Sequence, residues 1–395
     1  MTKRILFTFV GGQGHLDPLV PIADEARAAG HAVAFACSRS MAGAVEGTGF
    51  ELVDDPEAVP GRVSAPEPVA PSAGPGPLLP VDRAREERDL REKFVADGAR
   101  REAARILRTA RAWRPHVIVC DEADLGAVVA AERLAIPCAT VIVLAAGGML
   151  RPDVVAATLD EVRAEHGLAP DPGLARARGG LVIDPTPPGY RDPAHPLPDH
   201  TVRVALVRPA RPASTPRAWE PIRPDGPAVY VTLGTVFPLE SGDLLARVIA
   251  ALGDHPGDVV VTVGQEIDPA SLGPVPAHIH LERFVAQALV LPHVALVVSH
   301  AGSGTVLGAL AHGRPMVLLP MGADQPWNGD RCVAIGVARV LDPVRATAAD
   351  IRAAVRAVLA DPAMLAAAET VRDVMLAMAS PRAAIDAIER LAASG

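Results

Sequence analysis

The stretch from Ser299 to Gln325 places small and polar residues directly after apolar runs, a pattern that can bind a phosphate group. The apolar run 295–298 predicts a buried parallel strand. The turn 300–305, with the sequence HAGSGT, follows it and is predicted to lead into a helix from about Val306. Backbone N–H groups are free at such a turn, and the positive end of the helix dipole favours an anion there. Ordinary strand-to-helix turns share this pattern, so the turn alone leaves both interpretations open.

A histidine in the amino-terminal turn could act as a base. The run 4–10 predicts a buried strand, and His15 follows it in a glycine-rich turn. An imidazole at the carboxyl edge of a parallel sheet lies where open α/β sheets bind ligands, and its ordinary pKa lets it take a proton near neutrality. Asp121 follows the predicted strand 116–120 of the same domain. Its carboxylate could therefore converge on the histidine, fix the tautomer and stabilise the imidazolium.

Both residues also have ordinary structural explanations. His15 could start a helix and bond a neighbouring carbonyl, and Asp121 could cap the helix predicted from about Leu125. Asp124 competes for that cap. Residue types and order alone favour these structural roles, so a catalytic pair needs further support.

The same amino-terminal turn could belong to a dinucleotide site. Gly12 and Gly14 match the first two glycines of the G-x-G-x-x-G fingerprint, but Asp17 replaces the third. A carboxylate there would lie near the pyrophosphate, and the close helix packing that the third glycine permits is lost. Arg39, after the second strand, could read a 2′-phosphate. The broken fingerprint nevertheless argues against an NADP oxidoreductase.

Two series of alternating strands and helices must position these residues. The first starts with strand 4–10, a helix from about Pro18 to Ala29, and strand 32–37. Asp17 is predicted as the N-cap of that helix, and Gly30 is predicted to close it. A βαβ unit of this kind predicts a parallel, doubly wound sheet.

The second α/β series starts at about residue 228 and contains the stretch described first. A proline-rich segment, 208–227, precedes it and is predicted to be an interdomain linker. We therefore expect an amino-terminal domain over 1–207 and a carboxy-terminal domain over 228–379.

Composition limits the classes of partner. The 395 residues are 49% hydrophobic and 21% charged, which is typical of a globular protein with two sizeable cores. A formal net charge of -8 argues against nucleic acid and anionic membranes as partners. No apolar run reaches the ~18 residues of a membrane span, and the start MTKRILFTFV lacks the pattern of a signal peptide. The four widely spaced cysteines are then expected to be reduced thiols of a cytoplasmic protein.

Several short motifs occur in an order that points to a family. They are Gly14-His15 near Pro18, Val231-Thr232-Leu233-Gly234-Thr235, Phe284-Val285-Ala286-Gln287, His300-x-Gly302-x-Gly304-Thr305 and Asp324-Gln325. The chain resembles the GT-B fold, family 1 glycosyltransferases, in particular bacterial enzymes that glycosylate antibiotics and other natural products. The resemblance covers nearly the whole chain and is most specific in its carboxy-terminal half. It implies an α/β protein of two Rossmann-like domains, whose parallel sheets face an interdomain cleft.

The resemblance implies an inverting transfer from a nucleotide diphosphate sugar, dTDP- or UDP-linked, to a hydroxyl of a small natural-product acceptor. His15 matches the general base of the family, and Asp121 is similar in placement to the acidic partner of that histidine. We expect the acceptor to contact the amino-terminal domain, in particular region 145–180, and the donor to bind the carboxy-terminal domain. The last helix, about 380–395, would pack back on the amino-terminal domain.

The donor-binding residues also follow from the resemblance. The diphosphate would be held by His300, by the backbone of Ser303, Gly304 and Thr305, and by Thr235. Gly234 and Gly302 would also belong to the donor site. Phe284 would stack on the donor base, where the family often has tryptophan, and Val285 would bond that base through its backbone. Gln287 would contact the ribose, and Asp324 and Gln325 would read hydroxyls of the sugar.

This scheme predicts no cofactor, because the nucleotide sugar is a co-substrate. It also predicts no metal. Enzymes of the GT-A type hold a divalent ion with a DxD pair, a spacing that the segment 121–124 (DEAD) lacks. A sugar-nucleotide epimerase or hydrolase of the same fold, and a non-catalytic helper or binding protein, stay open as alternatives. A homodimer also stays open, and the sequence does not determine the acceptor, the sugar or the nucleotide.

Overall fold

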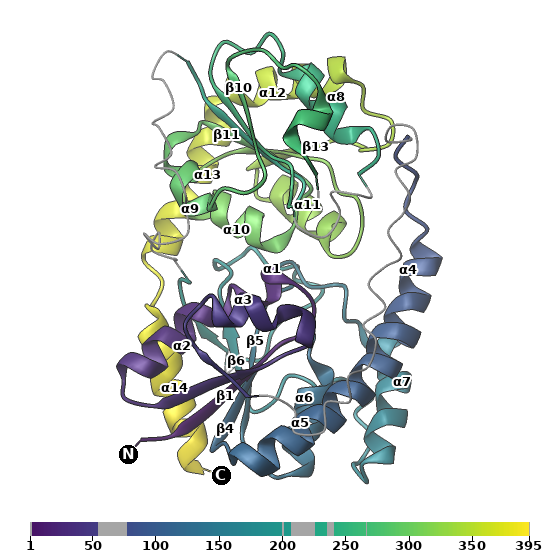
Figure 1. Cartoon of the computed structure of the whole chain (residues 1–395), viewed down its shortest axis with the longest axis vertical. Coiled ribbons are helices and arrows are strands. Elements are labelled where there is room, and N and C mark those ends of the chain that lie inside the picture. Colours follow the sequence, from purple (N-terminus) through teal and green to yellow (C-terminus); the bar gives the residue numbers. More distant parts are fainter. Residues whose placement is uncertain are drawn as a thin grey trace.

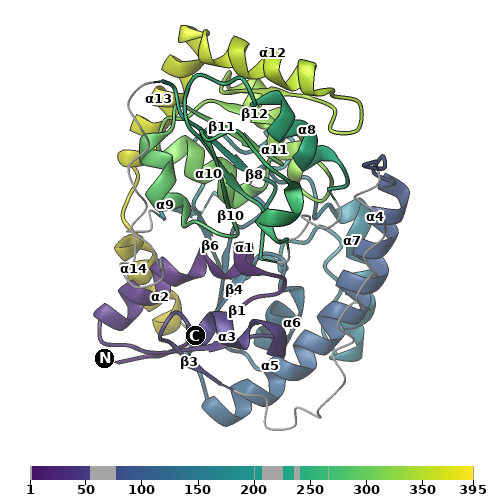
Figure 2. The same ribbon diagram turned by 45° about the horizontal axis from the view of Figure 1, so that its top comes forward.

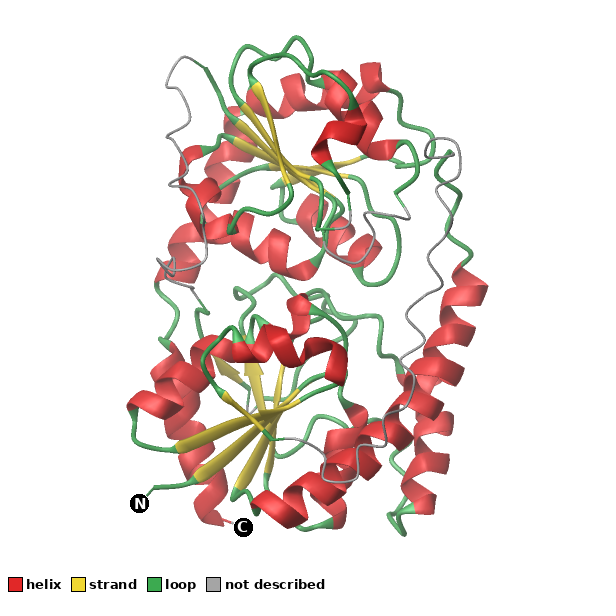
Figure 3. Cartoon of the chain, viewed as in Figure 1, coloured by secondary structure: helices red, strands yellow, loops and turns green. Residues whose placement is uncertain are grey.

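The computed structural model describes residues 2–53, 77–199, 201–206, 226–234, 241–265 and 267–394. In this part of the chain two parallel β-sheets form the centres of two α/β domains, one above the other in Figure 1. Figure 3 shows helices on both faces of each sheet. The predicted fold class, two parallel-sheet α/β domains, is confirmed.

The first sheet belongs to the amino-terminal domain. Its strands are β1 (Arg4–Thr8), β2 (Ala32–Ala36), β3 (Glu51–Leu52), β4 (Val117–Asp121), β5 (Cys138–Val141), β6 (Leu181–Asp184) and β7 (Val202–Arg203). Within the described residues they lie in the order β3-β2-β1-β4-β5-β6-β7, and all neighbours are parallel. The central strand β1 buries Ile5, Leu6 and Phe7 completely, because helices cover the sheet on both sides.

The second sheet belongs to the carboxy-terminal domain. Its strands are β8 (Val229–Thr232), β9 (Val259–Thr262), β10 (Ile279–Glu282), β11 (Leu296–Ser299), β12 (Met316–Leu318) and β13 (Ala338–Val340). Their order in the described residues is β10-β9-β8-β11-β12-β13, again with parallel neighbours. The strand order reverses between β8 and β11, which is where open α/β sheets bind ligands.

Helices complete both domains. In the amino-terminal domain they are α1 (Gln13–Leu16), α2 (Leu19–Ala28), η1 (Arg39–Met41), α3 (Ala42–Glu46), α4 (Arg83–Asp89), η2 (Leu90–Gly98), α5 (Ala99–Trp113), α6 (Leu125–Arg133) and α7 (Pro152–Glu165). After β8 they are α8 (Leu244–Ala251), η3 (Pro269–Leu272), α9 (Gln287–Val290), η4 (Leu291–His293), α10 (Ser303–Ala311), α11 (Gln325–Ala334), α12 (Ala348–Leu359), α13 (Pro362–Leu376) and α14 (Pro381–Ser394).

The last helix, α14, lies on the amino-terminal domain beside α2, as Figures 1 and 2 show. Ile385 and Ile388 are buried in the core that also contains residues of β1 and α2. Burying two such side chains contributes about 1.5–3 kcal/mol each. Glu389 also lies 2.9 Å from Nε2 of His31, and the carbonyl of Ala392 accepts from Nζ of Lys3 at 3.1 Å. The carboxy-terminal end of the chain therefore joins the two domains.

The first helical segment differs from the prediction. It begins at Gln13 as α1, and α2 follows with Pro18 as its N-cap. The expectation that Asp17 caps the helix is therefore wrong: Asp17 ends α1, and its Oδ1 accepts from Nε2 of Gln13 at 2.6 Å. The left-handed Gly11 (φ +92°) turns the chain directly into α1. Gly30 (φ +85°) follows the end of α2, as the sequence predicts.

Other boundaries also differ. α10 begins at Ser303, three residues before the predicted start at Val306, so the HAGSGT turn supplies the first turn of the helix. β6 and β13 lie outside the predicted strands, and the π-helical segment η2 ends at Gly98, where α5 follows. The helices α4, η2 and α5 form a long arm whose upper end reaches the carboxy-terminal domain (Figure 1). There, Oε1 of Glu86 accepts the N–H of Ala323 at 3.0 Å.

Two predictions fall mainly outside the described residues. Thr235 and residues 208–225 of the expected linker are not described, so the donor contact of Thr235 and the domain boundaries stay predictions. Among the described residues, no helix combines the length and the apolar character needed to cross a bilayer.

Candidate active site

The carboxyl ends of two adjacent strands bring His15 and Asp121 together. β1 and β4 pair with Thr8 opposite Cys120, so the turn after β1 and Asp121, the last residue of β4, lie at one edge of the sheet. Nδ1 of His15 lies 3.3 Å from Oδ2 of Asp121. Because a carboxylate only accepts, a proton on Nδ1 donates to Asp121 and leaves Nε2 with a free lone pair.

Backbone geometry fixes the ring of His15. A Cβ added at the left-handed Gly11 would lie 2.9 Å from Cδ2 of His15, so a larger residue there would collide with the imidazole. The side chain of His15 keeps 24% of its surface exposed, whereas that of Asp121 is fully buried. The imidazole is thus held against glycine backbone and a carboxylate while part of it stays accessible.

Asp121 is held by backbone donors as well. Its Oδ1 accepts the N–H groups of Ala123 at 2.6 Å and Asp124 at 3.0 Å, and its Oδ2 accepts the N–H of Val10 at 2.9 Å. Asp124, in contrast, caps α6, because its Oδ1 accepts the N–H of Ala127 at 2.9 Å. The capping role that competed with the catalytic interpretation of Asp121 is therefore filled by Asp124.

The surroundings of His15 raise its pKa above the ordinary value of 6.5. Burial lowers this pKa, but the negative charge and hydrogen bond of Asp121, with smaller contributions from Asp324 and Glu122, outweigh that effect. Asp324 belongs to the carboxy-terminal domain, where burial raises the pKa of its own carboxyl group. The charge of Asp324 in one domain therefore affects the pKa of His15 in the other.

His300 lies at the centre of the glycine-rich turn of the carboxy-terminal domain. β8 and β11 pair with Thr232 opposite Ser299, so the turns that follow these strands are adjacent. A Cβ added at Gly234 or Gly302 would collide with Nε2 of His300, so the ring fits only between two glycines. Burial lowers the pKa of His300 to about 4, against an opposing hydrogen bond with the backbone of Thr232. The ring is thus neutral at pH 7.

The first turn of α10 presents backbone N–H groups between the domains. Gly302 is its N-cap and supplies no side chain to bond them, and Ser303 and Gly304 follow. Oγ1 of Thr305 accepts from Nε2 of Gln287 at 3.0 Å, which fixes α9 against α10. Unpaired N–H groups at the positive end of a nine-residue helix can bind an anionic group.

Five residues form an interdomain clasp, consisting of Ser303, Asp324, Asn328, Ala145 and Ala146. Oδ2 of Asp324 accepts from Oγ of Ser303 at 2.6 Å and from Nδ2 of Asn328 at 2.8 Å. From the amino-terminal domain, the N–H of Ala145 donates to Oγ of Ser303 at 2.8 Å. The N–H of Ala146 donates to Oδ1 of Asn328 at 3.1 Å. The clasp joins the predicted donor residues to the loop after β5.

Asn328 was not singled out from the sequence. It is fully buried, and the carbonyl of Ala301 accepts from its Nδ2 at 3.0 Å. Its spacing of four residues from Asp324 places both on one face of a helix, which is a weak signal. Ala146, whose N–H donates to Asn328 across the domain boundary, is 182 residues away in the sequence. Only the folded chain shows that contact.

The remaining predicted donor residues lie around the same turns. Gln325 begins α11, and its Oε1 accepts the N–H of Met321 at 2.7 Å. Phe284 follows β10 with 52% of its surface exposed, so its ring is accessible for stacking. Val285 is buried beside it.

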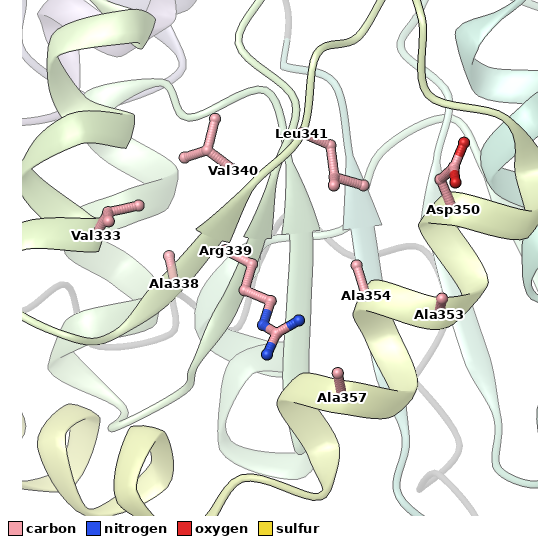
Figure 4. Close-up of a pocket in the computed structure, with 9 residues that line it drawn as sticks. All are labelled: Val333, Ala338, Arg339, Val340, Leu341, Asp350, Ala353, Ala354 and Ala357. Carbon is pink, nitrogen blue, oxygen red and sulfur yellow. The ribbon is translucent and has the colours of Figure 1, made fainter.

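One surface groove lies away from these residues. A groove of about 650 Å³ lies along β13 and α12 (Figure 4). Its charged side chains, Arg339 and Asp350, lie apart in that view, and Asp350 is engaged in a capping box with Thr347. Since ligand pockets usually combine an apolar lining with convergent polar groups, this groove is a weak candidate. It contains none of the predicted site residues.

Known proteins resemble this chain in both sequence and architecture. Residues 246–391 match a family described as erythromycin biosynthesis protein CIII-like, C-terminal domain. 4'-Demethylrebeccamycin synthase of Lentzea aerocolonigenes is 30% identical, over 99% of this chain and 100% of its own length. Tylactone mycaminosyltransferase of Streptomyces fradiae is 27% identical, over 99% and 92%. The solved structure of the spinosyn rhamnosyltransferase SpnG matches with a TM-score of 0.79 and 26% identity, over 98% of this chain and 100% of that chain.

The chain has two parallel-sheet α/β domains, and its carboxy-terminal helix α14 packs on the first of them. Together with this structural match, these features define a glycosyltransferase of the GT-B fold. The full-length relationship then gives the family. The chain belongs to the family 1 glycosyltransferases of the natural-product, antibiotic-biosynthesis type.

The charges around His15 and His300 predict opposite titration behaviour. We expect His15 to titrate above pH 6.5 and its pKa to fall in Asp121→Asn, because the largest stabilising charge is lost. His300, with a pKa of about 4, should show no titration between pH 5 and pH 8. Histidine-selective NMR titration measures both, with His15→Ala and His300→Ala assigning the signals. A His15 pKa that Asp121→Asn leaves unchanged would contradict the account.

Proposed function

We propose that this glycosyltransferase moves a sugar, with inversion, from a nucleotide diphosphate sugar to a hydroxyl of a small acceptor, using His15 as general base. The observation that carries the proposal is the pair of His15 and Asp121, 3.3 Å apart, at the carboxyl edge of one sheet. The carboxylate of Asp324, from the donor domain, is close enough to affect the pKa of that histidine. A base and a donor site would thus meet between the domains.

In the proposed step, Nε2 of His15 takes the proton of the acceptor hydroxyl as its oxygen attacks the anomeric carbon. The bond from that carbon to the diphosphate oxygen breaks, and the nucleoside diphosphate leaves on the opposite face. Asp121 stabilises the imidazolium that forms. Attack opposite the leaving group inverts the anomeric centre, which is why one base is sufficient.

The leaving diphosphate gains negative charge, and the first turn of α10 would receive it. The N–H groups of Ser303 and Gly304 are placed before the charge develops, so no reorganisation is needed during the reaction. The neutral ring of His300 would add a hydrogen bond to the diphosphate but no charge. Asp324 and Gln325 would bind sugar hydroxyls, and Phe284 would stack on the base.

A thymidine nucleotide is the donor that we favour. A solved structure of SpnG, 25% identical to this chain with a TM-score of 0.78, is complexed with thymidine diphosphate. Another structure of SpnG is complexed with spinosyn aglycone, which supports a natural-product acceptor for this chain. UDP as the nucleotide and a homodimer stay open as alternatives, and a cytoplasmic location stays a prediction.

Replacing the proposed base should abolish transfer and spare donor binding. We expect His15→Ala to lower kcat by at least about a hundredfold, since general base catalysis contributes about 10²–10⁴ in rate. Its affinity for dTDP, measured by calorimetry, should stay within about twofold of the wild type. His293→Ala, at an exposed histidine of the donor domain, is the matched control and should keep full activity. Unchanged turnover in His15→Ala would rule out the base assignment.

Transfer should also proceed without a divalent metal. Backbone N–H groups, rather than a metal ion, are proposed to hold the diphosphate, so dialysis against EDTA should leave the rate within about twofold. The described residues contain no group of three or more His, Cys, Asp or Glu side chains placed to hold a metal. Mass spectrometry of the glycosylated acceptor measures the rate. Recovery of activity only on adding Mg²⁺ or Mn²⁺ would contradict the proposed scheme.

A further inference from the structure

A cavity of about 250 Å³ lies in the amino-terminal domain, within the region where acceptor contacts are expected. One part of its lining is apolar and comprises Leu125, Leu144, Met149, Leu150, Val155 and Leu174. Another part carries charge, from Glu122, Arg178 and Arg191. A cavity with one apolar and one charged side fits a small amphipathic molecule.

The two arginines are not neutralised by ion pairs. Nε of Arg191 donates to the carbonyl of His195 at 2.7 Å, but its buried Nη1 has no hydrogen-bond partner among the described residues. Nη1 of Arg178 donates to the carbonyl of Pro196 at 3.1 Å. Neither guanidinium has a carboxylate within 4.0 Å in the described part of the chain. Burial and then the charge of Arg191 lower the pKa of Arg178, so the two cations are close enough to repel each other.

Glu122 does not compensate for both charges. Its Oε1 already accepts the N–H groups of Val143 at 3.0 Å and Leu144 at 2.6 Å. Burial raises the pKa of Glu122, against the opposing charges of Arg191 and Arg178. One carboxylate facing two guanidinium groups leaves the charged side of the cavity with an excess of positive charge. Since the buried Nη1 of Arg191 has no hydrogen-bond partner among the residues that the structure describes, and leaving such a group unpaired is costly, a ligand anion would stabilise the site.

The fold holds Arg191 against the cavity wall. Gly147 has φ +79°, and a Cβ added there would lie 3.0 Å from Nη2 of Arg191. The guanidinium therefore packs on bare backbone of the loop after β5, and a side chain at position 147 would displace it. The same loop supplies Ala145 and Ala146 to the interdomain clasp.

The cavity adjoins the proposed catalytic pair. Glu122, which lines it, directly follows Asp121 in the chain, and the charge of Glu122 contributes to the raised pKa of His15. Gly148, also in the lining, packs against Trp327 of the donor domain. The cavity thus shares Glu122 with the electrostatic surroundings of His15 and contacts the donor domain at Gly148.

We propose that the acceptor of this enzyme carries an anionic group, such as a carboxylate, that binds Arg178 and Arg191, while its apolar body fills the cavity. The proposal rests on the proposed transfer to a small acceptor and adds the chemical class of that acceptor. Guanidinium groups bind carboxylates with charge-assisted hydrogen bonds, often through two donors at once. Arg191 lines the cavity, and its unpaired Nη1 is the donor that such a group would satisfy.

Matched pairs of aromatic probes test the charge requirement. 4-Hydroxybenzoate and 6-hydroxy-2-naphthoate each have a neutral methyl ester of nearly the same shape, and all four carry a hydroxyl. Their affinities for the full-length protein can be measured by calorimetry in the presence of dTDP. Arg191→Gln and Arg178→Gln remove each charge and keep a polar side chain. Arg101→Gln, at an exposed arginine of α5, is the matched control.

We expect at least one carboxylate to bind at least about tenfold more tightly than its ester. Arg191→Gln and Arg178→Gln should each remove most of that preference, leave the affinity for the ester unchanged, and unfold at the wild-type temperature. Arg101→Gln should behave like the wild type. Equal affinities for acid and ester, or a preference that both arginine variants retain, would overturn the proposal. Calorimetry with inorganic phosphate is a further check. Binding of phosphate that depends on Arg191, with no preference for the aromatic acids over their esters, would also overturn the proposal.

Transfer assays with a dTDP-sugar separate this proposal from the proposed function. Glycosylation of the esters as fast as the acids would contradict the anion site and leave the transfer reaction intact. Arginine-dependent binding of the acids with no glycosylation of any acceptor would instead support the anion site and count against the transfer reaction.

Discussion

A fully buried carboxylate must find hydrogen-bond donors, and Asp121 has four at the point where β1 and β4 end. Three are backbone N–H groups, and the fourth is Nδ1 of His15 when that nitrogen carries the proton. The carboxylate therefore fixes the turn after β1, the end of β4 and the imidazole in one network. Its charge also sets the pKa of His15, so position and basicity of the proposed base have the same origin.

The two domains contribute different chemistry to this network. The amino-terminal side contributes a partly exposed imidazole with a raised pKa, whereas the donor side contributes backbone N–H groups and the neutral His300. The interdomain clasp brings them together, with Asn328 accepting a backbone N–H from the opposite domain. The amino-terminal domain contributes backbone N–H groups of Ala145 and Ala146 to these contacts, from the loop that also borders the cavity.

Local patterns in the sequence predict the parts of the site that one strand and its turn determine. Apolar runs predict the parallel strands, and the turns after β1 and β11 place His15 and His300 at sheet edges. The sequence does not show the start of α1, because that start depends on the φ of Gly11. No role could be assigned to Asn328 and Arg191 from the sequence, because both side chains act through contacts with distant segments. Asn328 contacts the loop after β5, and Arg191 lines a cavity. Long-range pairing, rather than residue type, distinguishes them from ordinary buried polar residues.

The central claim is that His15 acts as a base whose pKa Asp121 raises. The dependence of kcat/KM on pH, compared between the wild type and Asp121→Asn, tests it most directly. Because only the neutral imidazole accepts a proton, the wild-type rate should fall with decreasing pH through a pKa above 6.5. In Asp121→Asn that fall should move to lower pH, and the plateau should be lower because the ring tautomer is no longer fixed. An acidic limb at the same pH in both proteins would contradict the claim.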